Sequence, residues 1–195
     1  MINRSIKHVK GITPKIKAIL YLDNTLSSAV FYKIFFDFYT EKKFNFHVQV
    51  LNYDKITNYL PKLPSNSCFD LSLTRYFSYE EALKYAEMNE FNIFYHQESI
   101  ENILSKSIGY FCQEKPFECL NYIKNCNNNS FTVVNLFQEI KNKEIIYYGH
   151  INQFKRQIEK SKFNKSENAI FNYLVDLNAQ NPLALYNIFS TLKKL

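Results

Sequence analysis

The stretch from Asp23 to Ser28 holds the side chains of this sequence that are best placed to bind or react with a ligand. It follows an apolar run, Lys17 to Leu22, that has the length of a buried strand, and it precedes a helical pattern. In open α/β sheets, ligands bind beyond the carboxyl ends of parallel strands, and this turn leaves the first strand at that end. We therefore expect Asp23, Asn24 and Ser28 to bind whatever ligand the protein takes.

The serines of this stretch also have a purely structural interpretation. A serine at the N-cap of a helix accepts a hydrogen bond from a backbone N–H group of the first turn, and it needs no ligand to be useful there. Ser27 and Ser28 stand at the start of the helical pattern and could serve as such caps. The sequence leaves the ligand-binding role and the capping role open.

The four cysteines and four histidines form no motif that is typical of redox or metal chemistry. Cys112, Cys119 and Cys126 are spaced by seven residues, which places neighbours about 10 Å apart along a helix, beyond disulfide reach. Cys68 lies far from them in the chain. We expect reduced thiols that pack as small apolar groups, no metal site, and no dithiol oxidoreductase activity.

The composition bounds the class of protein. The chain has 195 residues, 46% hydrophobic and 22% charged, as expected for one globular domain over residues 1–195. Three glycines are too few for a glycine-rich phosphate loop. The net charge of +6 invites a nucleic-acid partner, but the lysines are scattered among acids and belong to a composition rich in Phe, Tyr, Lys, Asn and Ile. The scatter argues against nucleic acid as the partner.

The periodicity predicts a β-α-β unit over residues 17–53. The run at 17–22 fits a strand, apolar residues recur at helical spacing from about 28 to 43, and alternation returns at 46–53. Two strands joined by a crossover helix of this length are normally parallel. The fold class is therefore α/β, rich in helix.

The remaining chain carries mostly helical signals. We expect a helical insertion over residues 54–130, with Ser78 as an N-cap before Glu80 and Glu81, a short extended connector at 91–95, a helix opened by Ser99 or Glu101, and a further helix at 118–125. Residues 125–130 predict a surface loop. Within 131–195, the part from 131 to 151 fits either a β-hairpin or a helix, and helices are expected at 152–163, 169–177 and after Pro182.

The order of strand, Asp-containing turn, helix, strand, proline-rich loop and helical block resembles the DsbA-like branch of the thioredoxin fold, in particular 2-hydroxychromene-2-carboxylate isomerases and kappa-class glutathione transferases. Asp23 matches the aspartate that ends the first strand of that family. The family's serine-proline pair has no identical counterpart, because Leu26 stands near the serine, between Thr25 and Ser27, and no proline follows. The resemblance implies a thioredoxin-like βαβ core.

The resemblance also carries the functional expectations. A thioredoxin-like site without a Cys-x-x-Cys pair implies a degenerate, non-catalytic interaction or regulatory protein, with a protein partner or a second copy of the chain bound through some of its 18 Phe and 15 Tyr. The alternative is a glutathione-dependent isomerase or transferase in which Ser27 or Thr25 is the catalytic hydroxyl, and glutathione is the cofactor in that case alone. A basic nucleic-acid-binding protein is the second alternative. No run of apolar residues is long enough to span a membrane, so we expect a cytoplasmic protein.

Overall fold

The computed structural model describes residues 16–42, 47–57, 59, 69–70, 76–123, 131–154 and 165–194. In these residues the strands are β1 (Lys17–Tyr21), β2 (His47–Leu51), β3 (Phe69–Asp70), β4 (Ile93–His96) and β5 (Thr132–Asn135). The helices are α2 (Leu26–Lys42), the 3-10 turn η1 (Tyr53–Ile56), α3 (Tyr79–Met88), α4 (Ile100–Cys112), α5 (Pro116–Ile123), α6 (Asn142–Ile151), α7 (Lys165–Gln180) and α8 (Ala184–Leu192).

All described strands belong to one parallel sheet with the order β3-β2-β1-β4-β5. From β1, the sheet continues through β2 to β3 on one side and through β4 to β5 on the other side. The strand order therefore reverses between β1 and β4, at what we call the switch point. The expected β-α-β unit is confirmed, because β1 pairs in parallel with β2 and α2 connects them. The α/β class is confirmed with it.

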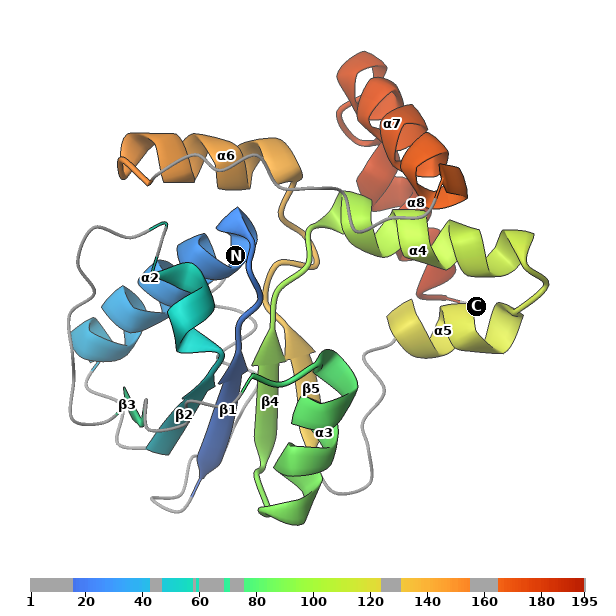
Figure 1. Cartoon of the computed structure of the whole chain (residues 1–195). Helices are drawn as coiled ribbons and strands as arrows, with labels where there is room; N and C mark the ends of the chain where they lie inside the picture. Colours follow the sequence, from blue (N-terminus) through green and yellow to red (C-terminus); the bar gives the residue numbers. More distant parts are fainter. Residues whose placement is uncertain are drawn as a thin grey trace.

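Helices cover both faces of the sheet (Figure 1). Ala18 and Leu20 of β1 point into a core with the buried residues of α2 and with Ile145 of α6. Ile19 points to the opposite face, where Ala82 and Ala86 of α3 pack. Strands that are buried on both faces are apolar without alternation, as expected for a parallel sheet.

The expected helical insertion over residues 54–130 is wrong, because it contains β3 and β4. The connector expected at 91–95 supplies β4, which pairs with β1 on one side and with β5 on the other. Its four residues are apolar or aromatic on both faces and too few to show a period. This segment is a central strand because it pairs with two distant strands. Ile93 pairs with Ala18, 75 residues before it, and with Thr132, 39 residues after it.

The segment 131–151 forms neither the hairpin nor the single helix that its pattern allowed. Thr132–Asn135 is a strand parallel to β4, and residues 142–151 form α6. The described strands contain no antiparallel pair that could close a thioredoxin-like sheet. The thioredoxin-like βαβ layout is therefore wrong, although its first three elements are right. A short β-α-β unit is common to both folds, and the later pairings separate them.

A third core lies beside the carboxyl ends of the strands, where α4, α5, α7 and α8 gather (Figure 1). The helices expected near 118–125, 169–177 and after Pro182 are confirmed as α5, α7 and α8. The helix expected at 152–163 does not start at 152, because Gln153 has a φ of 56°. Residues 155–163, the loop at 125–130, Cys68 and Cys126 lie outside the described residues. No helix of the described part is long and apolar enough to cross a membrane.

The sequence correctly predicts the residues that begin α3 and α4. Ser78 Oγ accepts a hydrogen bond from Glu81 N, and Glu81 Oε2 accepts one from Ser78 N, which is a complete capping box. Ser99 caps α4 by accepting from Asn102 N. These caps depend on residues three positions apart, so the sequence contains all the information that they need.

The contact between α6 and the start of α2 gives a first testable prediction. A Cβ atom on Gly149 of α6 would lie 3.1 Å from Leu26 Cδ1, whereas a Cβ atom on Gly109 of α4 would meet Glu167 Cγ at 3.4 Å. Both glycines are inside helices, where alanine is favoured by up to about 1 kcal/mol. We expect Gly109→Ala to keep or raise the free energy of unfolding. The free energy of unfolding of Gly149→Ala should be lower than that of Gly109→Ala by at least about 1 kcal/mol, because the added methyl group overpacks the core against Leu26. Urea titration of both variants measures this, and equal midpoints would contradict the close contact.

Candidate functional site

The turn after β1 is closed by its own side chains. Ser28 Oγ donates a hydrogen bond of 2.6 Å to Asp23 Oδ1, and Thr25 Oγ1 donates to the same oxygen. In return, Ser28 Oγ accepts from Asp23 N at 2.8 Å, and Thr25 Oγ1 accepts from Ser28 N at 3.2 Å. The expected ligand-binding residues Asp23 and Ser28 are thus brought together with Thr25 in one network at the carboxyl end of β1.

Thr25, and not a serine, caps α2. It precedes Leu26, the first helical residue, and its hydroxyl accepts from the third N–H group of the helix. Ser27 is half-buried, and its hydroxyl forms no hydrogen bond with any described residue. Asn24 is exposed, and its backbone oxygen accepts from Tyr59 Oη at 3.3 Å. The capping role predicted for Ser27 and Ser28 is therefore wrong, since Thr25 caps the helix.

Gln97, directly after β4, reaches across the switch point to this network. Ser28 is fully buried, Gln97 is 6% exposed, and Gln97 Nε2 donates to Ser28 Oγ. Because the Ser28 proton is already given to Asp23, the group that faces Ser28 Oγ must be a donor, which fixes the orientation of the amide. Gln97 Oε1 is then left buried without a hydrogen-bond partner among the described residues.

Asn52, directly after β2, holds the backbone around the site. Its side chain donates to the carbonyl oxygens of Leu22 and Phe77, each at 2.9 Å, and accepts from Phe77 N at 2.8 Å. Asn52 has a φ of 61°, a backbone conformation that asparagine tolerates better than most residues. It is 2% exposed. One amide thus fixes the ends of β1 and β2 and the segment that enters α3.

A second polar group lies on the α3 side of β4. His96 is buried with its ring 5.5 Å from that of Tyr79, and burial lowers its pKa to about 4. Glu98 accepts hydrogen bonds from Lys106 Nζ at 2.5 Å and from the Tyr122 hydroxyl. Burial, together with the charge of Glu98, raises the pKa of Tyr122 well above its usual range. Burial also raises the pKa of Tyr79. At neutral pH the histidine and both tyrosines are therefore uncharged, and Glu98 forms an ion pair with Lys106.

The arrangement is suited to binding a ligand by hydrogen bonds. The hydroxyls of Thr25 and Ser28 are held within the turn by their hydrogen bonds to Asp23, and the Thr25 hydroxyl also caps α2. The Asp23 carboxylate beside the start of α2 opposes a thiolate at that position. This geometry gives no support to the catalytic roles that the resemblance implied for Ser27 and Thr25 with glutathione.

The described residues contain no group of three or more His, Cys, Asp or Glu that could hold a metal ion. Cys112 is exposed at the end of α4, and Cys119 is buried in α5 within the third core. Burial raises the pKa of the Cys119 thiol, which disfavours the thiolate that a metal would require. The residues that the structure describes therefore do not fit a metal or iron–sulfur centre.

Sequence reasoning missed Gln97 and Asn52. Each directly follows a strand, at the edge of the sheet where ligands are expected. Asn52 follows the correctly predicted strand at 46–53 but was included in it. Gln97 was missed because residues 91–95 were interpreted as a connector. A correct assignment of β4 would have placed Gln97 beside the turn at 23–28.

No protein-family model and no curated protein sequence matches this chain. Among solved structures, it is similar to the U34-tRNA thiolase NcsA from Methanococcus maripaludis with its 4Fe–4S cluster. The identity is 10%, the TM-score is 0.67, and the match covers 99% of this chain and 76% of the thiolase chain. At this identity the likeness shows the fold. It overturns the DsbA-like resemblance, and with it the interpretation as a degenerate thioredoxin-fold protein or a glutathione-dependent isomerase.

The role of Asn52 predicts a large loss of stability on its removal. Asn52→Gly keeps the backbone conformation but leaves Leu22 O and both backbone groups of Phe77 without their partner. We expect the free energy of unfolding to fall by roughly 2–4 kcal/mol. Glu114→Gly is the matched control, since Glu114 is exposed and has a φ of 59°. It should leave stability unchanged or raise it by up to about 1 kcal/mol. Similar losses in both variants, measured in urea, would contradict the clamp.

The burial of His96 predicts a pH dependence of stability. Its pKa is about 4 in the folded chain and 6.5 when unperturbed. Below pH 6.5 the unfolded chain therefore binds a proton that the folded chain does not, and the free energy of unfolding falls as the pH drops. The loss should reach about 2 kcal/mol by pH 5. His96→Phe lacks the titrating group, so its free energy of unfolding should not show this loss. Relative to the wild-type protein, the free energy of unfolding of His96→Phe should therefore rise by about 2 kcal/mol between pH 7 and pH 5. A His96 ring resonance that titrates near pH 6.5 would refute the expectation.

Proposed function

We propose that this protein acts in tRNA modification and binds an unpaired nucleotide of tRNA at the switch point between β1 and β4. The observation that carries the proposal is Gln97, whose Oε1 atom is buried at that point and receives no hydrogen bond from the residues that the structure describes. The fold likeness to a tRNA thiolase over nearly the whole chain supports tRNA as the class of partner.

An unpartnered buried amide oxygen is costly, at roughly 1–3 kcal/mol, and such groups in native proteins call for an explanation. A ligand that donates a hydrogen bond to Gln97 Oε1 would remove this cost. Unpaired RNA bases are recognised through hydrogen bonds on their edges, and the N–H groups of uracil, guanine, adenine and cytosine are donors of the required kind. The ligand therefore has a donor that can reach the carboxyl end of β4.

The charges around the site favour recognition of a base over recognition of a phosphate. Asp23 lies in the turn itself, and the ammonium groups of Lys33 on α2 and Lys106 on α4 are paired with Asp37 and Glu98. The net charge of +6 for the whole chain favours association with a polyanion. This proposal departs from the expectation, based on the scatter of the lysines, that nucleic acid is not the partner.

The cytoplasmic location expected from the sequence is compatible with tRNA as a partner. A protein partner or a second copy of the chain stays a prediction from the aromatic content. Cluster chemistry of the kind named for the thiolase forms no part of the proposal, because the described cysteines do not fit such a centre. The proposal concerns how the nucleotide is bound.

Fluorescence anisotropy with an unmodified tRNA transcript tests the proposal, with a DNA duplex of similar length as the competitor. We expect tRNA to bind more tightly than the duplex at physiological salt. Gln97→Leu removes the amide at similar volume, and it should weaken tRNA binding by about 5- to 10-fold, which corresponds to one hydrogen bond. Circular dichroism of the variant establishes that it is folded.

Asn178→Leu is the matched control. Asn178 of α7 is also a buried amide, 7% exposed, and its Oδ1 atom has no hydrogen-bond partner in the described part of the chain. Helix α7 packs in the third core, away from the switch point. Its replacement should leave tRNA binding unchanged. A folded Gln97→Leu protein with wild-type affinity, or a wild-type protein that prefers the DNA duplex, would overturn the proposal.

A further inference from the structure

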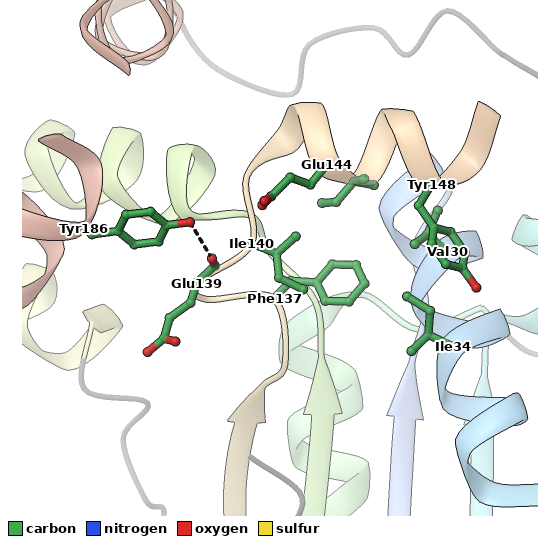
Figure 2. Close-up of a pocket in the computed structure, with 9 residues that line it drawn as sticks. Val30, Ile34, Phe137, Glu139, Ile140, Glu144, Tyr148 and Tyr186 are labelled. Carbon is green, nitrogen blue, oxygen red and sulfur yellow. Dashed lines mark hydrogen bonds between the residues drawn. The ribbon is translucent and has the colours of Figure 1, made fainter. Parts of the chain in front are cut away.

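A cavity of about 290 Å³ lies between α2, α6 and α8, apart from the switch point (Figure 2). None of the residues 23–28 and 97 lines it. Its walls combine apolar side chains, two tyrosines and two glutamates: Val30, Ile34, Phe137, Glu139, Ile140, Glu144, Ile145, Tyr148 and Tyr186. Small-molecule sites have this composition, with mostly apolar walls and a few polar groups that set the orientation of the ligand.

Three aromatic rings surround the cavity. Figure 2 shows Tyr186 of α8 on one side, Tyr148 of α6 on the other, and Phe137 from the connection after β5 between them. Phe137 is 1% exposed, and its ring meets Phe31 of α2 edge-on at 5.6 Å. Aromatic faces attract ammonium groups through the ring quadrupole, and several rings around one space are a typical site for organic cations.

The charges near the cavity have the same preference. Glu139 and Glu144 line it, and no lysine or arginine of the described part of the chain does. Lys141 lies close by, but its Nζ atom donates to Pro182 O at 2.6 Å and sits 4.7 Å above the Tyr186 ring. Burial, followed by the charges of Glu144, Glu101 and Glu139, raises the pKa of Tyr186. Lys193 also lies near Glu139. The described charged groups around this ring therefore include three carboxyl groups, those of Glu101, Glu139 and Glu144, and two ammonium groups, those of Lys141 and Lys193.

We propose that this cavity binds a small organic cation with an apolar or aromatic body, of the arylalkylamine class. The apolar wall formed by Val30, Ile34 and Ile145 contacts the body, and the Glu144 carboxylate at the rim pairs with the ammonium group. Ligands that carry a phosphate or carboxylate are disfavoured, because they would meet two glutamates and no basic residue among the described lining residues. The site uses none of the residues that carry the tRNA proposal.

Three probes of similar shape separate the contributions of charge and body. 2-Phenylethylamine is a cation at neutral pH, 2-phenylethanol has the same number of heavy atoms without the charge, and 3-phenylpropionate is an anion. We expect isothermal titration calorimetry to give a Kd for the amine at least about tenfold lower than that for the alcohol, and no binding of the propionate. Equal binding of amine and alcohol, or no binding of the amine, would overturn the proposal.

Glu144→Gln is the informative variant. Glu144 Oε2 accepts a hydrogen bond from Lys141 N at the start of α6, and glutamine can accept the same bond, so the start of the helix is kept. The variant should bind the amine about 5- to 10-fold more weakly and lose most of the preference over the alcohol. Glu139→Gln is a second variant with an expected effect of the same sign, because Glu139 also lines the cavity.

Glu118→Gln on the exposed side of α5 is the control and should leave both affinities unchanged. A folded Glu144→Gln protein that keeps the wild-type preference for the amine would show that the carboxylates do not recognise the cation, and it would refute the proposal. Chemical shift changes in the wild-type protein give an independent location, since they should concentrate on Phe137, Tyr148 and Tyr186.

Discussion

The hydrogen bonds of the Asn52 side chain are the constraint on which the carboxyl edge of this sheet depends. Parallel strands end without a hairpin, so their last carbonyl and N–H groups need partners from elsewhere. Asn52 supplies three such bonds from one buried amide, to Leu22 and Phe77. The end of β1, the turn after it and the start of α3 are thereby fixed relative to β2, and the switch point takes its shape from this arrangement.

With the backbone fixed, the turn at 23–28 does not require glycine. Two of its backbone N–H groups are satisfied by short side chains, since Ser28 Oγ accepts from Asp23 N and Thr25 Oγ1 accepts from Ser28 N. A glycine-rich loop leaves its N–H groups free for a phosphate, whereas this turn uses these two internally and places the Asp23 carboxylate beside them. The turn therefore differs from a phosphate-binding loop at the same position of an open α/β sheet.

Local signals in the sequence were sufficient for the elements whose partners lie nearby. The change from strand period to helix period predicted β1, α2 and β2, and Ser78 with Glu81 predicted the start of α3. The same signals failed for β4 and β5. Residues 93–96 and 132–135 are short apolar runs, and only pairing with β1 and with each other makes them strands. The choice between a thioredoxin-like sheet and the observed order depended on those two strands, so an incorrect resemblance followed from a correct first unit.

The sequence by itself determined that this is an α/β protein whose first strand ends in a polar turn with Asp23, Thr25 and Ser28. These features depend on hydrophobic period and on residues a few positions apart. Only the tertiary structure decided what those side chains face. In the folded chain, Gln97 contacts Ser28, which lies 69 residues before it, and Thr25 caps α2. The packing of α2, α6 and α8 forms a cavity. Contacts of this kind depend on which strands pair and which helix faces meet, and no local pattern in the chain encodes that choice.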